Sequence, residues 1–191
     1  MNSVTRSVIR AEANEKNIVD TLSEIRAVKS YLRTIERSIG YSNSSKAFFH
    51  VENITQHMNK AKESGTEFIW SATFVINGYT AQFCVRLDSD GSTVWVAVFL
   101  HFCPGPQDAF LQWPFRMGYD VSVVHPKDPT KDIIAAVRSN AGSGPCSRSF
   151  DKPKTKRNSG CGRQRLLSRN SVEKDGYIYN DAITVGVALR A

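Results

Sequence analysis

The chain has 191 residues, of which 41% are hydrophobic and 23% charged, with a net charge of +7. That length allows one good hydrophobic core, or one domain with an extension. The longest apolar stretch, residues 94–102, is too short to cross a bilayer of roughly 30 Å, and the N-terminus has no apolar signal-peptide core. We therefore expect no membrane insertion and a location in the cytosol or nucleus. Of these two, we predict a cytoplasmic location.

The sequence contains no pattern typical of an enzyme, a cofactor site or a metal site. It has no Gly-x-Ser-x-Gly, no phosphate-binding glycine loop and no His-Glu-x-x-His. Four cysteines lie far apart without a Cys-x-x-Cys pair, so free thiols are expected in a reducing compartment. They are Cys84, Cys103, Cys146 and Cys161. We therefore expect no catalytic residues, no cofactor and no metal.

Residues 1–39 are predicted to form a coiled-coil helix. The segment has no proline or glycine, and apolar residues recur every seven positions, at Val4, Ala11, Ile18, Ile25, Leu32 and Ile39. A stripe one residue wide with this repeat is typical of a seam between helices. The alternative is an amphipathic helix that packs on its own domain.

Residues 40–65 are predicted to connect this helix to the rest of the chain. Gly40 and the Ser- and Asn-rich residues 42–45 interrupt the helical pattern. Further on, Phe48, Val51, Ile54 and Met58 stand at helical spacing, which favours a short helix within 47–64.

Residues 66–191 have the pattern of an antiparallel β-sandwich or barrel. Segments with strand-like composition alternate with turn signals roughly every 8–12 residues. The expected strands include 68–76, 79–87, 94–103, 119–125 and a last strand pair over 177–191. The sequence Asp-Ser-Asp-Gly at 88–91 predicts a hairpin turn rather than a calcium loop, because no glutamate stands at the closing position. The fold class is therefore mainly β.

One sequence block carries a resemblance to a known family. Residues 108–115 read DAFLQWPF, and a strand-like segment follows at 119–124. This block closely resembles the signature of the C-terminal domain of the tumour-necrosis-factor-receptor-associated factors, the TRAF family, a MATH-type β-sandwich. Weaker matches occur on both sides of this block, in the same order as in the family, at 68–70, 78–91, 147–153, 159–161 and 177–181.

The resemblance implies a function as well as a fold. TRAF proteins place a coiled coil before the sandwich, trimerise through it and bind extended receptor-tail peptides on an edge strand. The chain is therefore expected to be an intracellular, homotrimeric signalling adaptor. Its expected partners are the cytoplasmic tails of cell-surface receptors or other adaptors. The RING and zinc-finger modules of typical members are not found in the sequence, so no ubiquitin-ligase activity is expected.

Matching the family's peptide site residue by residue gives seven candidates. Two match its charged positions, one matches an apolar contact, two match the outer hydroxyls of a serine cluster, and two match a pair where the peptide passes close to the backbone. In that order they are Arg86, Asp90, Phe99, Ser147, Ser149, Ser159 and Gly160. An arginine fork suits an acidic peptide side chain. The alternative for Arg86, which stands in mid-strand, is a buried salt bridge.

The candidate site departs from the family pattern in four ways. Arg148 replaces the middle serine, which suggests a more acidic ligand, and the family's tyrosine near Arg86 is missing. The small residues 140–144 replace an aromatic. About twenty residues are lacking between Val75 and Gly78, enough for a strand or two at roughly 5–6 residues each. These departures leave the peptide preference open.

The segment 148–169 supports an alternative function. It carries eight basic residues opposed by Asp151 alone, so its excess equals the net charge of the whole chain. Such a run can bind nucleic acid or another acidic polymer. Aromatic residues are not interleaved with the charges of 152–157, which disfavours stacking on a single strand. An acidic protein partner is therefore preferred over nucleic acid.

Overall fold

The computed structural model describes residue 18 and residues 21–25, 44–139, 144 and 146–190. The chain divides into two compact units, residues 1–41 and 42–191. In the first unit, residue 18 and residues 21–25 are helical. Ile18, Leu22 and Ile25 are exposed on this helical segment. The rest of the coiled coil predicted for residues 1–39 lies outside the described residues.

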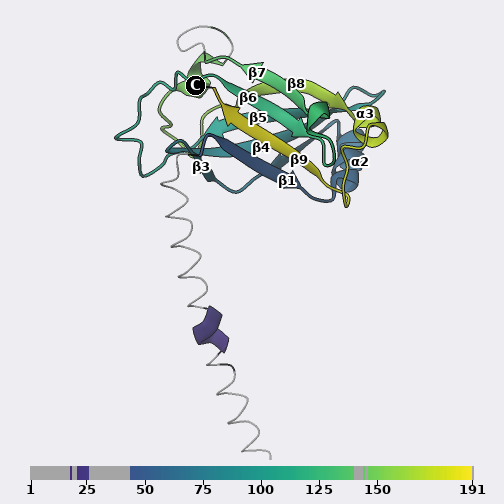
Figure 1. Cartoon of the computed structure of the whole chain (residues 1–191), viewed down its shortest axis with the longest axis horizontal. Coiled ribbons are helices and arrows are strands. Elements are labelled where there is room, and N and C mark those ends of the chain that lie inside the picture. Colours follow the sequence, from purple (N-terminus) through teal and green to yellow (C-terminus); the bar gives the residue numbers. More distant parts are fainter. Residues whose placement is uncertain (1–17, 19–20, 26–43, 140–143, 145, 191) are drawn as a thin grey trace, which may run out of the picture. The chain divides into compact units, whose positions relative to one another are not determined.

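The second unit is an antiparallel β-sandwich, as predicted (Figure 1). One sheet has the order β1-β9-β6-β7, formed by Lys46–Val51, Ile183–Leu189, Tyr119–Val124 and Ile133–Val137. The other has the order β2-β4-β5-β8, formed by Thr66–Trp70, Tyr79–Ser89, Val94–Phe102 and Cys161–Ser168. A short strand, β3 (Phe74–Ile76), also pairs with β4. The helices α2 (Ile54–Ser64) and α3 (Arg169–Lys174) lie together at one end, where Arg169 Nη1 donates to Asn59 Oδ1 at 2.9 Å.

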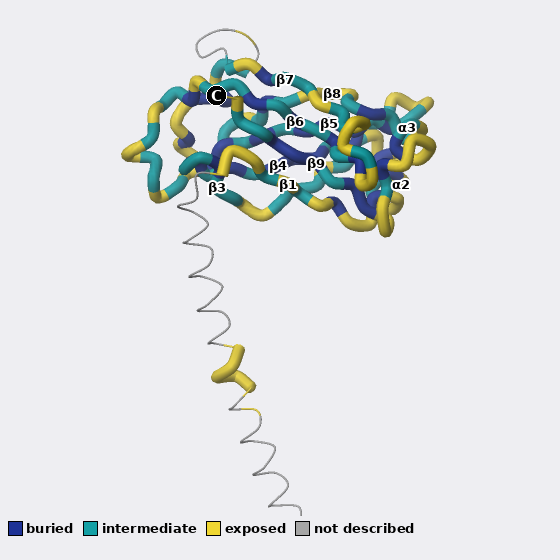
Figure 2. The backbone as a smooth tube through the Cα atoms, viewed as in Figure 1, coloured by how far each residue is buried: buried dark blue, intermediate teal, exposed yellow. Residues whose placement is uncertain are grey.

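The core fills the space between the two sheets (Figure 2). Successive residues of a strand point to opposite faces, so alternate apolar residues reach the core. In β4, Phe83, Val85 and Leu87 are fully buried. The buried residues of the other sheet include Val121, Val123, Val185 and Val187. The alternation that predicted these strands therefore produces the sandwich.

The DAFLQWPF block supplies aromatic side chains to one end of this core. Phe115 is fully buried, with its ring centroid 4.6 Å from that of Phe102 and 5.0 Å from that of Tyr79. Trp113 packs edge-on against Tyr79 at 5.1 Å. The Tyr79 hydroxyl donates to the Gln112 carbonyl oxygen at 2.9 Å. The block thus fastens the segment after β5 onto the core.

The predicted connector is wrong from residue 46 onward. Residues 46–51 form β1, which pairs with β9 along its whole length, and Ile54 and Met58 of α2 are fully buried. Asn53, with φ of 53°, separates the strand from the helix. The apolar spacing runs across this junction, which explains why it suggested one helix. The short helix expected within 47–64 exists, but it begins at Ile54.

Other differences concern strand positions. The strands β7 and β8 were not expected, and the predicted strand pair over 177–191 is the single strand β9 preceded by an isolated bridge between Tyr179 and Ala182. The β3-β4 hairpin turns at Asn77 and Gly78, both with positive φ, which suits a tight two-residue turn. Within the part of the chain that the structure describes, no helix combines the length and hydrophobicity needed to span a membrane.

Candidate peptide-binding site

A slot of about 150 Å³ opens on the outer face of the β2-β4-β5-β8 sheet. The strand register sets Cys84 of β4 between Trp70 of β2 and Phe99 of β5. Cys84 faces outward because its neighbours Phe83 and Val85 fill the core. It forms the floor between aromatic walls. The full lining is Phe68, Trp70, Cys84, Arg86, Phe99, His101 and Gly160.

Arg86 closes one end of the slot. Its Nε donates to Asp88 Oδ2 at 2.8 Å, and both side chains are about one-quarter to one-third exposed. Its guanidinium carbon lies 4.9 Å from the centroid of the Phe99 ring, a cation–π distance. Arg86 therefore forms a salt bridge, which was the alternative to a ligand role, but the pair is partly exposed rather than buried. The same side chain also lines the slot.

The opposite end is organised by Trp70 and the loop before β8. The guanidinium carbon of Arg157 lies 3.7 Å from the Trp70 ring centroid. The His101 ring packs edge-on against Trp70 with centroids 4.9 Å apart, and its Nδ1 donates to the Asn158 carbonyl oxygen at 2.9 Å. These contacts hold the loop against the sheet. They also fix which nitrogen of His101 carries the proton.

Gly160 stands where a side chain would not fit. A Cβ at this position would lie 2.3 Å from His101 Nε2. Gly162, which pairs with Phe99 in the sheet, is tighter still, since a Cβ there would lie 1.9 Å from the Val98 carbonyl oxygen. On this side, the slot is therefore bounded by backbone atoms at Gly160 rather than by a side chain.

The polarity of the slot follows from its burial. Burial raises the pKa of the Cys84 thiol to about 11, although Arg86 and Arg157 act in the opposite direction. The Cys84 thiol is therefore neutral near pH 7. Burial lowers the pKa of His101, and the charge of Arg157 lowers it further, against the raising effect of the bond to Asn158. The arginines are the cations of the site.

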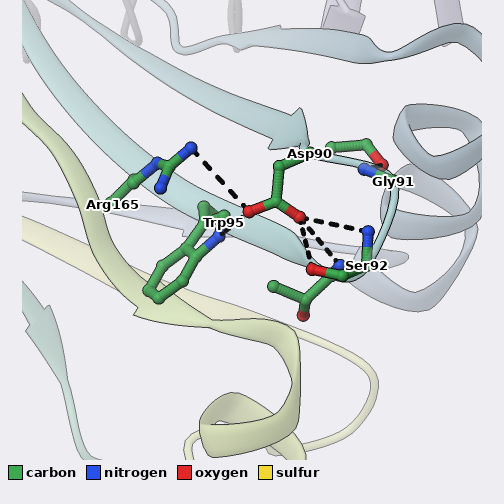
Figure 3. A network of polar contacts seen from close by, with 7 residues as sticks. Asp90, Gly91, Ser92, Trp95 and Arg165 are labelled. Atoms are coloured by element: carbon green, nitrogen blue, oxygen red, sulfur yellow. Dashed lines mark hydrogen bonds and ion pairs between the residues drawn. The ribbon is translucent and has the colours of Figure 1, made fainter.

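Asp90 lies in the β4-β5 turn (Figure 3) and is not among the residues that line the slot. Its Oδ1 accepts from the backbone amides of Ser92 and Thr93 at 3.2 and 3.0 Å, and its Oδ2 accepts from Trp95 Nε1 at 2.9 Å. Arg165 Nη2 lies 3.8 Å from the same Oδ2. The bonds from Thr93, Ser92 and Trp95 hold the pKa of Asp90 well below its usual range. The carboxylate therefore organises the turn, and a peptide contact by Asp90 stays a prediction.

The three candidate serines do not line the slot. Ser147 and Ser149 belong to the short 3₁₀ helix η2 (Ser147–Phe150), where Ser149 is buried at 4% exposure. Ser159 is exposed and precedes Gly160, which does line the slot. Arg86, Phe99 and Gly160 are thus brought together, whereas a role for the serines stays a prediction.

The prediction of four free thiols is wrong for two of the cysteines. Cys146, just before η2, and Cys161, at the start of β8, form a disulfide with their Cα atoms 5.6 Å apart. Cys84 and Cys103 are free and buried. A separation of 15 residues carries no pairing signal. Only the return of the chain from η2 to the sheet edge brings the two sulfurs together.

The segment 148–169 is not one basic loop. Residues 161–168 form β8, and arginines of both β8 and α3 have partners within the described structure. Arg163 Nη2 donates to the Ala136 carbonyl oxygen at 2.6 Å, and Arg169 Nε donates to Glu173 Oε1 at 2.8 Å. The charges are therefore dispersed over the loop, the sheet and α3. This dispersal weakens the case for a polyanion-binding loop.

Sequence reasoning missed several slot residues, and some of them carry a usable signal. Phe68 and Trp70 share one parity in β2, and Cys84 shares the parity of Arg86 in β4. Two-residue periodicity around Arg86 could have found these three. His101 shares the parity of Phe99 in β5, so the same periodicity could have found it. Arg157 carries no such signal, because its place depends on how the loop before β8 folds back onto the sheet.

The second unit is thus an antiparallel β-sandwich with a partly aromatic slot on one outer face. The model of the MATH domain family matches residues 46–189, so the chain belongs to that family. The matched region begins with β1 and ends with β9. Residues 46–65 of the predicted connector therefore belong to the domain. The domain is of the TRAF type, as the relatives show.

Two curated relatives and one solved structure are similar to the chain. It is 25% identical over 206 residues to TNF receptor-associated factor 5 of Mus musculus, covering 99% of this chain and 36% of that protein. It is 23% identical over 205 residues to TNF receptor-associated factor 2 of Homo sapiens, covering 95% and 40%. The chain thus spans less than half the length of these relatives. The structure of Notothenia coriiceps TRAF5 matches with a TM-score of 0.67 at 19% identity, covering 98% of this chain and 94% of that one, and shows the shared fold.

Proposed function

We propose that the chain is a non-enzymatic signalling adaptor that binds short segments of receptor tails or other adaptors in the slot on its β2-β4-β5-β8 sheet. The observation that carries this proposal is the slot itself, where Phe68, Trp70 and Phe99 surround a thiol floor and Arg86 closes one end. The curated relatives, which are named as TNF receptor-associated factors, support the same role.

The dimensions of the slot favour a peptide over a small molecule. Its volume of about 150 Å³ lies below the roughly 300–1,000 Å³ typical of small-molecule pockets. A space of this size accommodates one apolar side chain of an extended segment. The backbone of that segment then lies across the sheet, close to Gly160.

The second part of the proposal is assembly through residues 1–39. Its support within the described residues is the exposure of Ile18, Leu22 and Ile25, at 60%, 47% and 53%. Apolar side chains at spacings of four and three residues on one helix suit a helix–helix seam. A trimer would present several weak slots together, which raises apparent affinity by roughly 10²–10⁴ toward clustered peptides.

Replacing Phe68 with alanine is expected to weaken peptide binding by roughly tenfold or more. Phe68 is 54% exposed and lines the slot, and burying such a ring on binding contributes roughly 1.5–3 kcal/mol. The measurement is a screen of short random peptides against the full chain. The peptides that bind are then titrated in solution and on a densely coated surface.

The matched control is Phe48→Ala. Phe48 is 63% exposed but belongs to β1, in the other sheet, so its removal should leave the titration unchanged. Equal losses in both variants would argue against the slot. Equal affinity for dissolved and surface-clustered peptide would argue against assembly.

A further inference from the structure

The slot has a guanidinium at each end. Along β4, the outward-facing residues Gln82, Cys84 and Arg86 follow one another, with alternate residues roughly 6.6–6.8 Å apart. Arg86 closes the end nearer the β4-β5 turn. Beyond the other end, Arg157 Nη1 lies 3.4 Å from Gln82 Oε1. An extended peptide of a few residues would therefore pass from one cation to the other.

The two cations differ in how far they are already neutralised. Arg86 has a carboxylate partner, Asp88, at 2.8 Å. The contacts of Arg157 are with neutral groups, the Trp70 ring and the Gln82 amide. Among the described residues, none of the ion pairs found includes Arg157. Of the two guanidiniums at the slot, that of Arg157 is therefore the one without a carboxylate partner among the described residues.

The position of Arg157 is also well fixed. Its guanidinium carbon lies over the Trp70 ring, 3.7 Å from the centroid, and the next residue, Asn158, donates its backbone amide to the Phe102 carbonyl oxygen at 2.9 Å. Its charge opposes the larger raising effect of burial on the pKa of Cys84 and contributes to the lowered pKa of His101, so its field extends over the slot. Because burial also lowers the pKa of His101, that side chain does not supply a competing cation near pH 7.

We propose that Arg157, and not Arg86, selects an acidic residue in the bound peptide. This inference rests on the proposed peptide-binding function and names the ligand class: an extended segment with one apolar side chain over Cys84 and an aspartate or glutamate on the Arg157 side. A guanidinium with unsatisfied donors gains a charge-assisted hydrogen bond from such a residue. Arg86 gains less, because Asp88 already occupies its Nε.

The test uses an array of synthetic Ser/Gly peptides, each with one central leucine and one glutamate at each flanking position in turn. A second array carries glutamine in place of glutamate. The wild-type full chain should bind the glutamate peptides roughly tenfold more tightly on one side of the leucine only. Arg157→Gln should reduce that ratio to about one, and any loosening of the loop that it causes should weaken the glutamate and glutamine peptides equally. Arg157→Glu should instead prefer lysine peptides at the same position.

Two control variants separate the possible outcomes. Arg86→Gln should keep the glutamate preference. Arg165→Gln should keep it as well, because the Arg165 guanidinium carbon lies 5.5 Å from the Trp95 ring centroid and Arg165 does not line the slot. If the preference disappears in Arg86→Gln and persists in Arg157→Gln, or if glutamate and glutamine peptides bind equally well, this inference is wrong and the proposed function stands. If peptides of neither array bind, both are wrong.

Discussion

Replacing Phe115 with alanine is expected to lower the free energy of unfolding by roughly 3–5 kcal/mol. The side chain is fully buried, and its ring centroid lies within 6.3 Å of those of Tyr79, Phe102, Phe150 and Tyr119. Its removal leaves a cavity that this rigid aromatic cluster fills only in part. Since a domain is stabilised by about 5–15 kcal/mol in total, the loss is a large fraction of the whole. Urea-induced unfolding measures it.

The same segment offers a matched control in Phe110, which is 90% exposed. Phe110→Ala removes the same number of atoms from the same loop, and its effect should stay within about 0.5 kcal/mol. Similar losses from both substitutions, or a loss below about 1 kcal/mol for Phe115→Ala, would contradict the position of the DAFLQWPF block at the core.

Breaking the Cys146–Cys161 disulfide is expected to destabilise the domain by about 3 kcal/mol, the loop-entropy value for a closed loop of this length. For a chain of this size, that corresponds to a fall in Tm of roughly 6–12 °C. The double substitution Cys146→Ser, Cys161→Ser in thermal unfolding measures the effect. The bridged loop carries Arg157, Asn158 and Gly160, so its loosening should also weaken peptide binding.

Reductant provides the control for this prediction. Dithiothreitol should lower the Tm of the wild type to that of the double variant and leave the variant unchanged. In unfolded, unreduced protein two thiols should titrate, those of Cys84 and Cys103. Four titratable thiols without reductant would contradict the disulfide.

The strands that could be predicted are those whose side chains alternate between the core and solvent. In β4 and β6, buried and half-buried residues alternate over most of the strand, and this pattern is visible in the sequence. The edge strand β8 was missed because its centre, from Arg163 to Arg165, is exposed, and because Arg165 has a positive φ of 53°. Its apolar pattern is too weak to distinguish a strand from a basic loop.

The candidate site could be predicted where one strand supplies several residues, or where a motif match marks the position. Phe99 of β5 pairs with Cys84, two residues before Arg86 in β4, and the Arg86 guanidinium carbon lies 4.9 Å from the Phe99 ring centroid. The pair of Arg157 and Trp70 could not be predicted, because a loop far along the chain returns to β2. Asp88, the second residue after Arg86 in β4, forms an ion pair with it, and this pair changes the charge available to a ligand.

The most direct test of the proposed function is a hydrogen-exchange footprint of a screened peptide on the full chain. Binding in the slot should slow exchange in β2, in β4 around Cys84, in β5 around Phe99 and at residues 157–160. Exchange on the β1-β9-β6-β7 sheet should not change. Protection confined to that other sheet, or to α2 and α3, would contradict the assignment of the slot as the peptide site.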